Sequence, residues 1–249
     1  MRPEPSFADA LAAVAHVDGW MTDGQARLLW DRALATASGE RIVEIGSFRG
    51  RSTTVLALAA PVGVDIVAID PHAGNDRGPQ EIEGFEDAAA EDHEMFHANL
   101  DRAGVAGRVR HVRAFSQDAL GAVSGEIALL YIDGAHRYRP ALADIRVWGG
   151  RVRRGGTLLI HDSFSSVGVT LAILRALTFG FRFRYVGRVG SMTEYRCELV
   201  ARGARRRNVA RQLRELPWFA RNVTIKVLLV ARLGALTRLL GHRSRDWPY

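Results

Sequence analysis

The sequence contains one cysteine, Cys197, and lacks any long uncharged apolar run. A single cysteine excludes an internal disulfide and is consistent with a reducing compartment. Its place in the strand-like run 195–200 predicts a small core residue rather than a nucleophile. No window of about 18 residues is apolar and free of charge, so no transmembrane helix is expected. Residues 1–15 also lack the charged start and apolar run of a secretory signal, and we therefore expect a cytoplasmic protein.

The body of the chain has no excess of positive charge, and the whole excess is concentrated at the C-terminal end. The whole chain has a net charge of +7, yet residues 202–249 hold 12 basic and two acidic residues, which gives this segment +10. The remaining residues carry a net charge of −3. A protein that binds RNA through its folded body needs a basic stripe there, so nucleic acid is disfavoured as a partner of the body.

The middle of the chain alternates strand and helix patterns, which indicates an α/β fold. We expect strands at 41–46, 64–70, 108–114, 126–133, 155–161, 181–187 and 193–200. Helices are expected at 6–16, 23–37, 51–60, 91–104, 138–149 and 167–178. Near-continuous apolar strands are buried on both faces, which predicts a doubly wound, mostly parallel sheet covered by helices.

Three regions follow from this pattern. Residues 1–38 form N-terminal helices, residues 39–201 form the main domain, and residues 202–249 form a basic helical extension. The last two strands have no clear helix between them, and we expect them to form an antiparallel hairpin.

Segment 41–50, RIVEIGSFRG, predicts the strand, turn and helix of a nucleotide-type pocket. Dinucleotide sites use G-x-G-x-x-G, whereas here three residues separate Gly46 from Gly50 and Glu44 precedes the turn. An acid before the turn suits a ligand with an amino group rather than a pyrophosphate. Asp70, 20 residues after Gly50, is placed to bind ribose hydroxyls. S-adenosylmethionine (SAM) carries an amine, a carboxylate and a ribose, and it matches this pocket.

Other polar residues flank the expected pocket. Ser47 and Ser52 place hydroxyls beside a helix N-terminus, whose free N–H groups and dipole favour a carboxylate. Ser116 and Gln117 follow the third strand and are placed to touch the adenine edge, although Ser116 can equally cap a helix. The alternative for the turn is an ordinary tight turn without a ligand. The polar stretch 71–90 is long enough to be a lid or substrate loop, or else a mobile surface loop.

Acids and histidines end the fourth and fifth expected strands. Asp133 is followed by His136, and the strand 155–161 ends at His161, next to Asp162. Because strand carboxyl ends converge on the ligand crevice, we expect these four side chains to gather near the SAM sulfur. They can hold a hard cation such as Mg²⁺ through Asp133 and Asp162, or form a metal-free acid–base cluster. Alternatively, Asp133 caps a helix and His136 is a surface histidine.

The segments VEIGSFRGRST, AIDPH and YIDGAHRYRPALADIRVWGGRVRRGGTLLIHD resemble the class I SAM-dependent methyltransferases. More narrowly, they resemble the branch that includes the macrocin and mycinamicin sugar O-methyltransferases. The resemblance covers about residues 17–200. It implies a Rossmann-like sheet of seven strands with a reversed final hairpin, SAM as methyl donor, and hydroxyl acceptors that are often sugars.

The resemblance also implies roles for single residues. His136 matches a general base, and Asp133 together with a later pair of acids matches the ligands of Mg²⁺ in metal-dependent relatives. If Asp162 is the first acid of that pair, Ser163 replaces the second; if His161 and Asp162 align with it, a histidine replaces the first. The catalytic candidates are therefore His136, Asp133 and His161, with Asp133 also touching SAM.

These residues predict an O-methyltransferase for a hydroxyl of a sugar, glycan or glycolipid, with Mg²⁺ as a possible second cofactor. One alternative is a methyltransferase for a small phenol, a catechol or another natural product. A further alternative is a SAM-binding protein without turnover, which uses its C-terminal extension for interactions.

The extension contains two expected helices, 204–216 and 218–240, separated by Pro217. Three roles compete for it. It can pack on the body or on a second subunit of a homo-oligomer, or it can lie on an anionic membrane surface through residues 204–240. It can also bind nucleic acid, although aromatic residues for base stacking are sparse there. The membrane alternative would place the protein peripherally on the inner face of the membrane.

Overall fold

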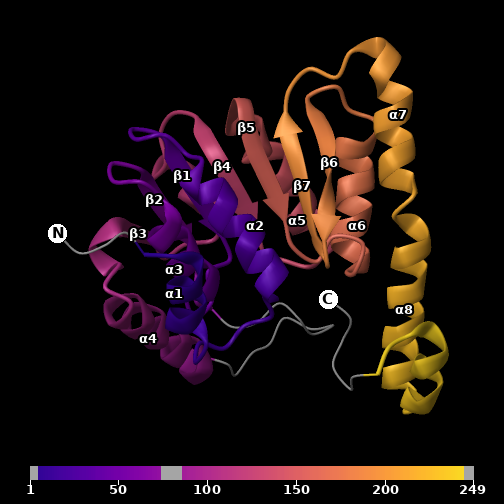
Figure 1. Cartoon of the computed structure of the whole chain (residues 1–249), viewed down its shortest axis with the longest axis horizontal. Helices are drawn as coiled ribbons and strands as arrows, with labels where there is room; N and C mark the ends of the chain where they lie inside the picture. Colours follow the sequence, from indigo (N-terminus) through magenta and orange to yellow (C-terminus); the bar gives the residue numbers. More distant parts are fainter. Residues whose placement is uncertain (1–4, 74–85, 244–249) are drawn as a thin grey trace.

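The computed structural model describes residues 5–73 and 86–243, and it contains one seven-stranded sheet in the order β3-β2-β1-β4-β5-β7-β6 (Figure 1). The strands are β1 (Arg41–Ile45), β2 (Asp65–Ile69), β3 (Val109–Val112), β4 (Ile127–Ile132), β5 (Val152–Ile160), β6 (Phe183–Val189) and β7 (Met192–Cys197). Strands β1 to β5 pair in parallel, and β7 is antiparallel to both of its neighbours. The predicted sheet with a reversed final hairpin is confirmed.

Helices cover both faces of the sheet (Figure 1). One layer contains α1 (Phe7–Val14), α2 (Asp23–Leu34), α3 (Arg51–Ala59) and α4 (Glu86–Arg102). The other contains α5 (Tyr138–Val147) and α6 (Val167–Ile173), which continues as the π-helical turn η4 (Leu174–Thr178). Short 3₁₀ turns are η1 (Ala106–Arg108), η2 (Asp118–Gly121) and η3 (Gly149–Arg151).

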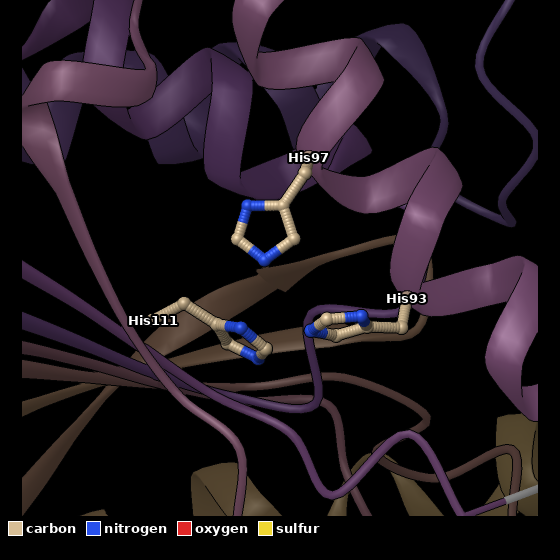
Figure 2. Close-up of side chains that lie close together, drawn as sticks. All are labelled: His93, His97 and His111. Atoms are coloured by element: carbon tan, nitrogen blue, oxygen red, sulfur yellow. The ribbon is translucent and has the colours of Figure 1, made fainter.

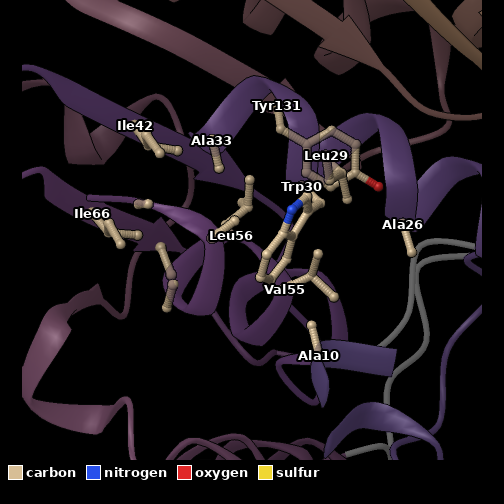
Figure 3. Packing of buried hydrophobic residues seen from close by; sticks show 14 of the residues in the cluster. Ala10, Ala26, Leu29, Trp30, Ala33, Ile42, Val55, Leu56, Ile66 and Tyr131 are labelled. Atoms are coloured by element: carbon tan, nitrogen blue, oxygen red, sulfur yellow. The ribbon is translucent and has the colours of Figure 1, made fainter. Parts of the chain in front are cut away.

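Successive side chains along each strand point to opposite faces of the sheet, and the core therefore has two halves. Ile42 and Leu129 face α1 to α4. Ile42 packs there with Leu29 and Leu56 (Figure 3). Val43 and its neighbours in β2 and β4 face the α5 and α6 layer. Because successive strand side chains point to opposite faces, a sheet covered on both sides needs apolar residues at almost every position. That need explains the near-continuous apolar runs in the sequence.

Helix α4 begins at Glu86, inside the stretch 71–90 that we expected to be a loop. The predicted loop was therefore too long at its C-terminal end, where Glu86 and the three alanines at 88–90 are good helix formers. Residues 74–85 lie outside the described residues, and with them most of the proposed lid.

The C-terminal extension forms α7 (Arg202–Leu213), α8 (Leu216–Val230) and the 3₁₀ helix η5 (Gly234–Leu240), which lie along the β6 edge (Figure 1). Pro217 is in the first turn of α8, where its missing N–H costs nothing. The second helix is shorter than expected because Arg232 has a φ of 61° and turns the chain. Among the described residues, no helix combines the length and the hydropathy that crossing a membrane requires.

Candidate active site

The glycine turn after β1, which runs from Gly46 to Gly50, packs against the end of β4. Gly46 has a φ of 86°, and a Cβ placed there would lie 2.3 Å from the carbonyl oxygen of Asp133. The Asp133 N–H also donates to the Ile45 carbonyl at 2.8 Å. Gly50, with a φ of 83°, begins α3 without a side-chain cap. The turn that we assigned to the ligand is thus in direct backbone contact with Asp133. Asp133 is the first residue of the acid and histidine cluster, which consists of Asp133, His136, His161 and Asp162.

Asp70 holds this turn in place through the backbone. Its Oδ2 atom accepts N–H bonds from Ser47 at 2.9 Å and Phe48 at 2.8 Å, and its Oδ1 atom accepts one from His72 at 2.8 Å. The carboxylate was expected to take ribose hydroxyls. The structure gives it this additional structural task, and its side chain is 15% exposed.

Glu44 has a different environment from the one we expected. It is fully buried, and its two carboxyl oxygens accept hydrogen bonds from Ser52 and Thr53 on α3. Glu44 was predicted to face a ligand amine and Ser52 a ligand carboxylate; instead the two bind each other and fasten α3 to β1. The sequence did not indicate a role for Thr53. Ser47 remains suited to a ligand, because its hydroxyl is buried without a hydrogen-bond partner.

Burial raises the pKa of Glu44 from 4.5 to about 8, since the hydrogen bonds from Ser52 and Thr53 only partly offset the loss of water. The charges of Asp133 and Asp70 add to the rise. Because the pKa of Glu44 is higher in the folded state, its carboxyl group loses its proton at a lower pH in the unfolded state than in the folded state. The unfolded state then binds fewer protons, so Glu44 makes the free energy of unfolding fall as pH increases from about 4.5 to 8.

Replacing Glu44 by glutamine should therefore flatten the dependence of Tm on pH in this window. The amide keeps a carbonyl oxygen for one hydroxyl and an N–H₂ group for the other, so the packing is retained. Thermal unfolding of wild type and Glu44→Gln between pH 4.5 and 8 measures the difference. A parallel decline of Tm in both proteins would contradict the assigned protonation of Glu44.

The second half of the site gathers four predicted residues at the ends of β4 and β5. His136 Nε2 lies 2.5 Å from Asp162 Oδ2, and His161 Nδ1 lies 3.2 Å from Asp133 Oδ1. Tyr131 donates from its hydroxyl to Asp133 Oδ2 at 2.9 Å. Tyr131 was missed, although its place two residues before Asp133 puts both side chains on one face of β4. As expected, the structure brings the side chains of Asp133, His136, His161 and Asp162 together.

Opposite charges inside this cluster shift the pKa values of its members. Burial alone would lower the pKa of His161, but the carboxylates of Asp133 and Asp162 raise it to about 10. Burial would likewise raise the pKa of Asp162, and the neighbouring His161 and His136 hold it well below its usual range. His161 is therefore a buried imidazolium beside two carboxylates, whereas His136, 17% exposed, is the imidazole nearer to solvent.

In the turn after β5, the two candidate neighbours of Asp162 lie in different environments. Asp162 has a φ of 53°, which aims its carboxylate at His136. Ser163 points away from the cluster and bonds to the Ile160 carbonyl at 2.8 Å and the Thr193 hydroxyl at 2.7 Å. Ser163 thus belongs to the core, and His161 occupies the place beside Asp162 in the site.

Ser116 and Gln117 lie in different environments. The Ser116 hydroxyl bonds to Asp144 on α5, and its carbonyl accepts from the indole of Trp148 at 3.1 Å. Gln117 is exposed at the start of η2 and makes no side-chain cap there. The structure therefore ties Ser116 to α5 instead of directing it toward an adenine, and it also excludes the cap at η2.

Helix α8 supports the turn that carries Asp162. Asn222 donates to the Phe164 carbonyl at 3.4 Å, and Lys226 donates to the Ser165 carbonyl at 2.9 Å. Burial lowers the pKa of Lys226, and the charge of Asp162 opposes that shift. Of the three roles considered for the extension, packing on the body is observed. No spacing in the sequence pairs α8 with this turn, because the contact spans 58 residues or more.

Residues 43–163 match the family model described as "Methyltransferase domain". This segment contains the glycine turn, Asp70 and the whole acid and histidine cluster.

Residues 43–163, just under half of the chain, are similar to a methyltransferase domain.

Solved structures that resemble the chain share the methyltransferase fold. The cofactor-bound Rv0187 from MTB is 23% identical, with a TM-score of 0.56, covering 76% of this chain and 88% of that one. The O-methyltransferase TomG from Streptomyces achromogenes, solved in complex with SAM, is 19% identical, with a TM-score of 0.54 and coverage of 78% and 89%. An O-methyltransferase from Bacillus cereus, in complex with SAH, is 17% identical, with a TM-score of 0.55 and coverage of 79% and 94%.

Among curated proteins, "Uncharacterized protein R132" from Acanthamoeba polyphaga mimivirus is 26% identical over 125 residues. The match covers 48% of this chain and 50% of that protein, so the chain spans about half the length of this curated relative. The methyltransferase domain is thus supported by a family match and by fold, while its acceptor must be argued from the site.

Proposed function

We propose that this methyltransferase domain transfers the methyl group of SAM to a hydroxyl of a sugar, glycan or glycolipid. One observation carries the proposal. The glycine turn of Gly46 contacts the backbone of Asp133, the residue at which the acid and histidine cluster begins. A donor bound on the turn would hold its reactive carbon near an imidazole whose partner is a carboxylate.

His136 is the general base of the proposed reaction. A neutral hydroxyl is a poor nucleophile, and an adjacent base that removes its proton contributes about 10²–10⁴ in rate. With Nε2 bonded to Asp162, the Nδ1 atom of His136 is buried without a hydrogen-bond partner, and it is the atom that would accept that proton from a bound acceptor. The oxygen forms a bond to the methyl carbon, the carbon–sulfur bond breaks, and the sulfur takes its electron pair. Asp162 then stabilises the imidazolium that results.

Asp133 and Asp162 fit a divalent cation such as Mg²⁺. The Oδ1 atom of Asp162 is buried without a hydrogen-bond partner, and Asp133, His136 and Asp162 offer ligand atoms within 4.8 Å of one another. A bound Mg²⁺ would orient the acceptor hydroxyl and lower its pKa. His161 contributes a fixed positive charge beside the same carboxylates and orients Asp133.

Calorimetry with SAM and SAH, followed by a methyl-transfer assay, tests this function. We expect binding of both and transfer to sugar or glycolipid hydroxyls, reduced by EDTA and restored by Mg²⁺. Transfer to catechols alone would favour the alternative small-phenol substrate. Binding without transfer to any acceptor would favour a non-catalytic SAM-binding protein, and absence of binding would contradict the proposal altogether.

We also propose that the C-terminal extension brings the enzyme to an anionic membrane surface. Large apolar side chains are exposed on α8, on η5 and in the turn between them: Val227 60%, Val230 74%, Leu233 50%, Leu236 45% and Leu239 85%. Exposed arginines at 232 and 238 adjoin them, in a segment with a net charge of +10. Apolar burial and attraction to anionic lipid act together at such surfaces.

Replacing Leu233, Leu236 and Leu239 by glutamine should weaken binding to phosphatidylglycerol vesicles at least about tenfold, because burying one leucine is worth about 1.5–3 kcal/mol. Co-sedimentation measures the loss. Val62→Gln removes a valine that is 88% exposed elsewhere and should bind like wild type. Deleting the whole extension is a poor test because α8 supports the Asp162 turn. Equal sedimentation of the triple variant and wild type would exclude this surface.

A further inference from the structure

Four of the chain's eight histidines form one cluster that includes none of the catalytic candidates. His93 and His97 lie on α4, His111 lies on β3, and His72 follows β2. The ring centroids of His93 and His97 are 4.8 Å apart, and His111 lies 5.4 Å from His93 and 5.3 Å from His97. Figure 2 shows the three rings of α4 and β3 turning nitrogen atoms toward a common space.

The spacing and the burial of these rings suit metal ligation. His93 and His97 are four residues apart, so they lie on the same face of α4. One nitrogen from each of His93, His97 and His111 lies within 4.8 Å of the others. Nitrogen ligands of a tetrahedral zinc ion, at about 2.0–2.1 Å from the metal, would be about 3.3 Å apart. Small rotations of the side chains close that difference, and the exposed His97 has room for them.

His111 supplies the second observation. Its Nε2 atom is buried and has no hydrogen-bond partner, an arrangement that costs free energy unless a ligand compensates it. Burial, together with the neighbouring histidines, lowers the pKa of His111 to about 4. The ring is therefore neutral at pH 7, which is the form that binds metals.

We propose that His93, His97 and His111 bind a divalent transition-metal ion, best fitted by Zn²⁺, which links α4 to β3. Three imidazoles favour zinc, copper or nickel, whereas Mg²⁺ prefers oxygen ligands. The site is therefore chemically distinct from the Asp133 and Asp162 pair.

His72 forms a wall of the proposed site and connects it to the glycine turn. Its ring lies 5.2 Å from that of His93 and 5.0 Å from that of His111. Its Nε2 atom lies 2.8 Å from the Phe48 carbonyl, and its N–H bonds to Asp70. A metal that fixes α4 against β3 would thus also restrain the residues that hold the turn.

Zinc titration of the EDTA-treated full chain by calorimetry tests the proposal. We expect one zinc ion per chain at the cluster, and an affinity for Zn²⁺ that falls more than about tenfold in His97→Gln, since even partners outside the ligand set typically matter 10- to 100-fold. His97 is exposed, so this variant should fold. Zn²⁺ should also raise Tm in wild type, because it binds only the folded state, and not in His97→Gln. Co²⁺ in place of zinc should give a tetrahedral visible spectrum.

Two matched variants locate the ion. His16→Gln changes an exposed histidine outside the cluster and should bind zinc like wild type. Asp162→Asn alters the catalytic cluster and should leave zinc at the histidines. Zinc lost in Asp162→Asn but kept in His97→Gln would overturn the proposal, as would equal zinc affinity and Tm shift in wild type and His97→Gln. None of these readouts requires SAM or methyl transfer, so they are independent of the proposed function.

Discussion

The His136→Gln variant is expected to lose a factor of about 10²–10⁴ in kcat while it binds SAM as tightly as wild type. Glutamine can still donate a hydrogen bond to Asp162, which lies 2.5 Å from the imidazole in wild type. It cannot accept the proton of an acceptor hydroxyl. The loss should therefore appear in the chemical step and not in the affinity for the donor.

Calorimetry with SAH and single-turnover methyl transfer separate these two effects. His16→Gln is the matched control, since it makes the same change at an exposed position outside the site. Full turnover in His136→Gln would show that another group removes the proton. A comparable loss of SAH affinity would instead assign His136 to the donor pocket.

The sheet could be predicted because its strands carry their own signal. A sheet that is buried on both faces needs uninterrupted apolar runs such as 127–132, and these are visible without any long-range information. The convergence of Asp133, His136, His161 and Asp162 followed from the same topology, because parallel strands end at one edge. Both inferences depend on the direction of the chain and on local patterns alone.

The orientation of single side chains could not be predicted in this way. Glu44 lies on the face of β1 that packs against α3, so it is paired with Ser52 and Thr53 inside the protein instead of facing a ligand. Whether an acid at the end of a strand is covered depends on which residues of the next helix lie above it. The sequence shows that helix but not its rotation.

Contacts between distant segments were also hidden. His93 and His97 show helical spacing in the sequence, but their third partner, His111, lies on a strand that only the fold brings to α4. Lys226 reaches the turn of Asp162 across 61 residues in the same way. Such clusters depend on how α4 and α8 dock, which no local pattern specifies.

Gly46→Ala is expected to be the most destabilising single substitution considered for this domain. Alanine at a φ of 86° costs about 1–2 kcal/mol from local strain alone. Its Cβ would also lie 2.3 Å from the Asp133 carbonyl oxygen and 2.7 Å from the Gly134 Cα, and both are backbone atoms that cannot turn aside. We expect a loss above about 4 kcal/mol, and hence a fall in Tm on the order of 10 °C or more.

The Gly39→Ala variant separates the cost of backbone strain at a positive φ from the cost of a steric clash with neighbouring atoms. Gly39 has a φ of 84°, almost the same as Gly46, yet a Cβ there would meet nothing within 4 Å. Its variant should lose only about 1–2 kcal/mol and keep its affinity for SAM. Thermal unfolding of both variants measures the difference, which is the free-energy cost of the clash between the added Cβ and the end of β4. Equal losses would mean that the turn can move away from Asp133, and the donor pocket and the base cluster would then not be held together by the backbone.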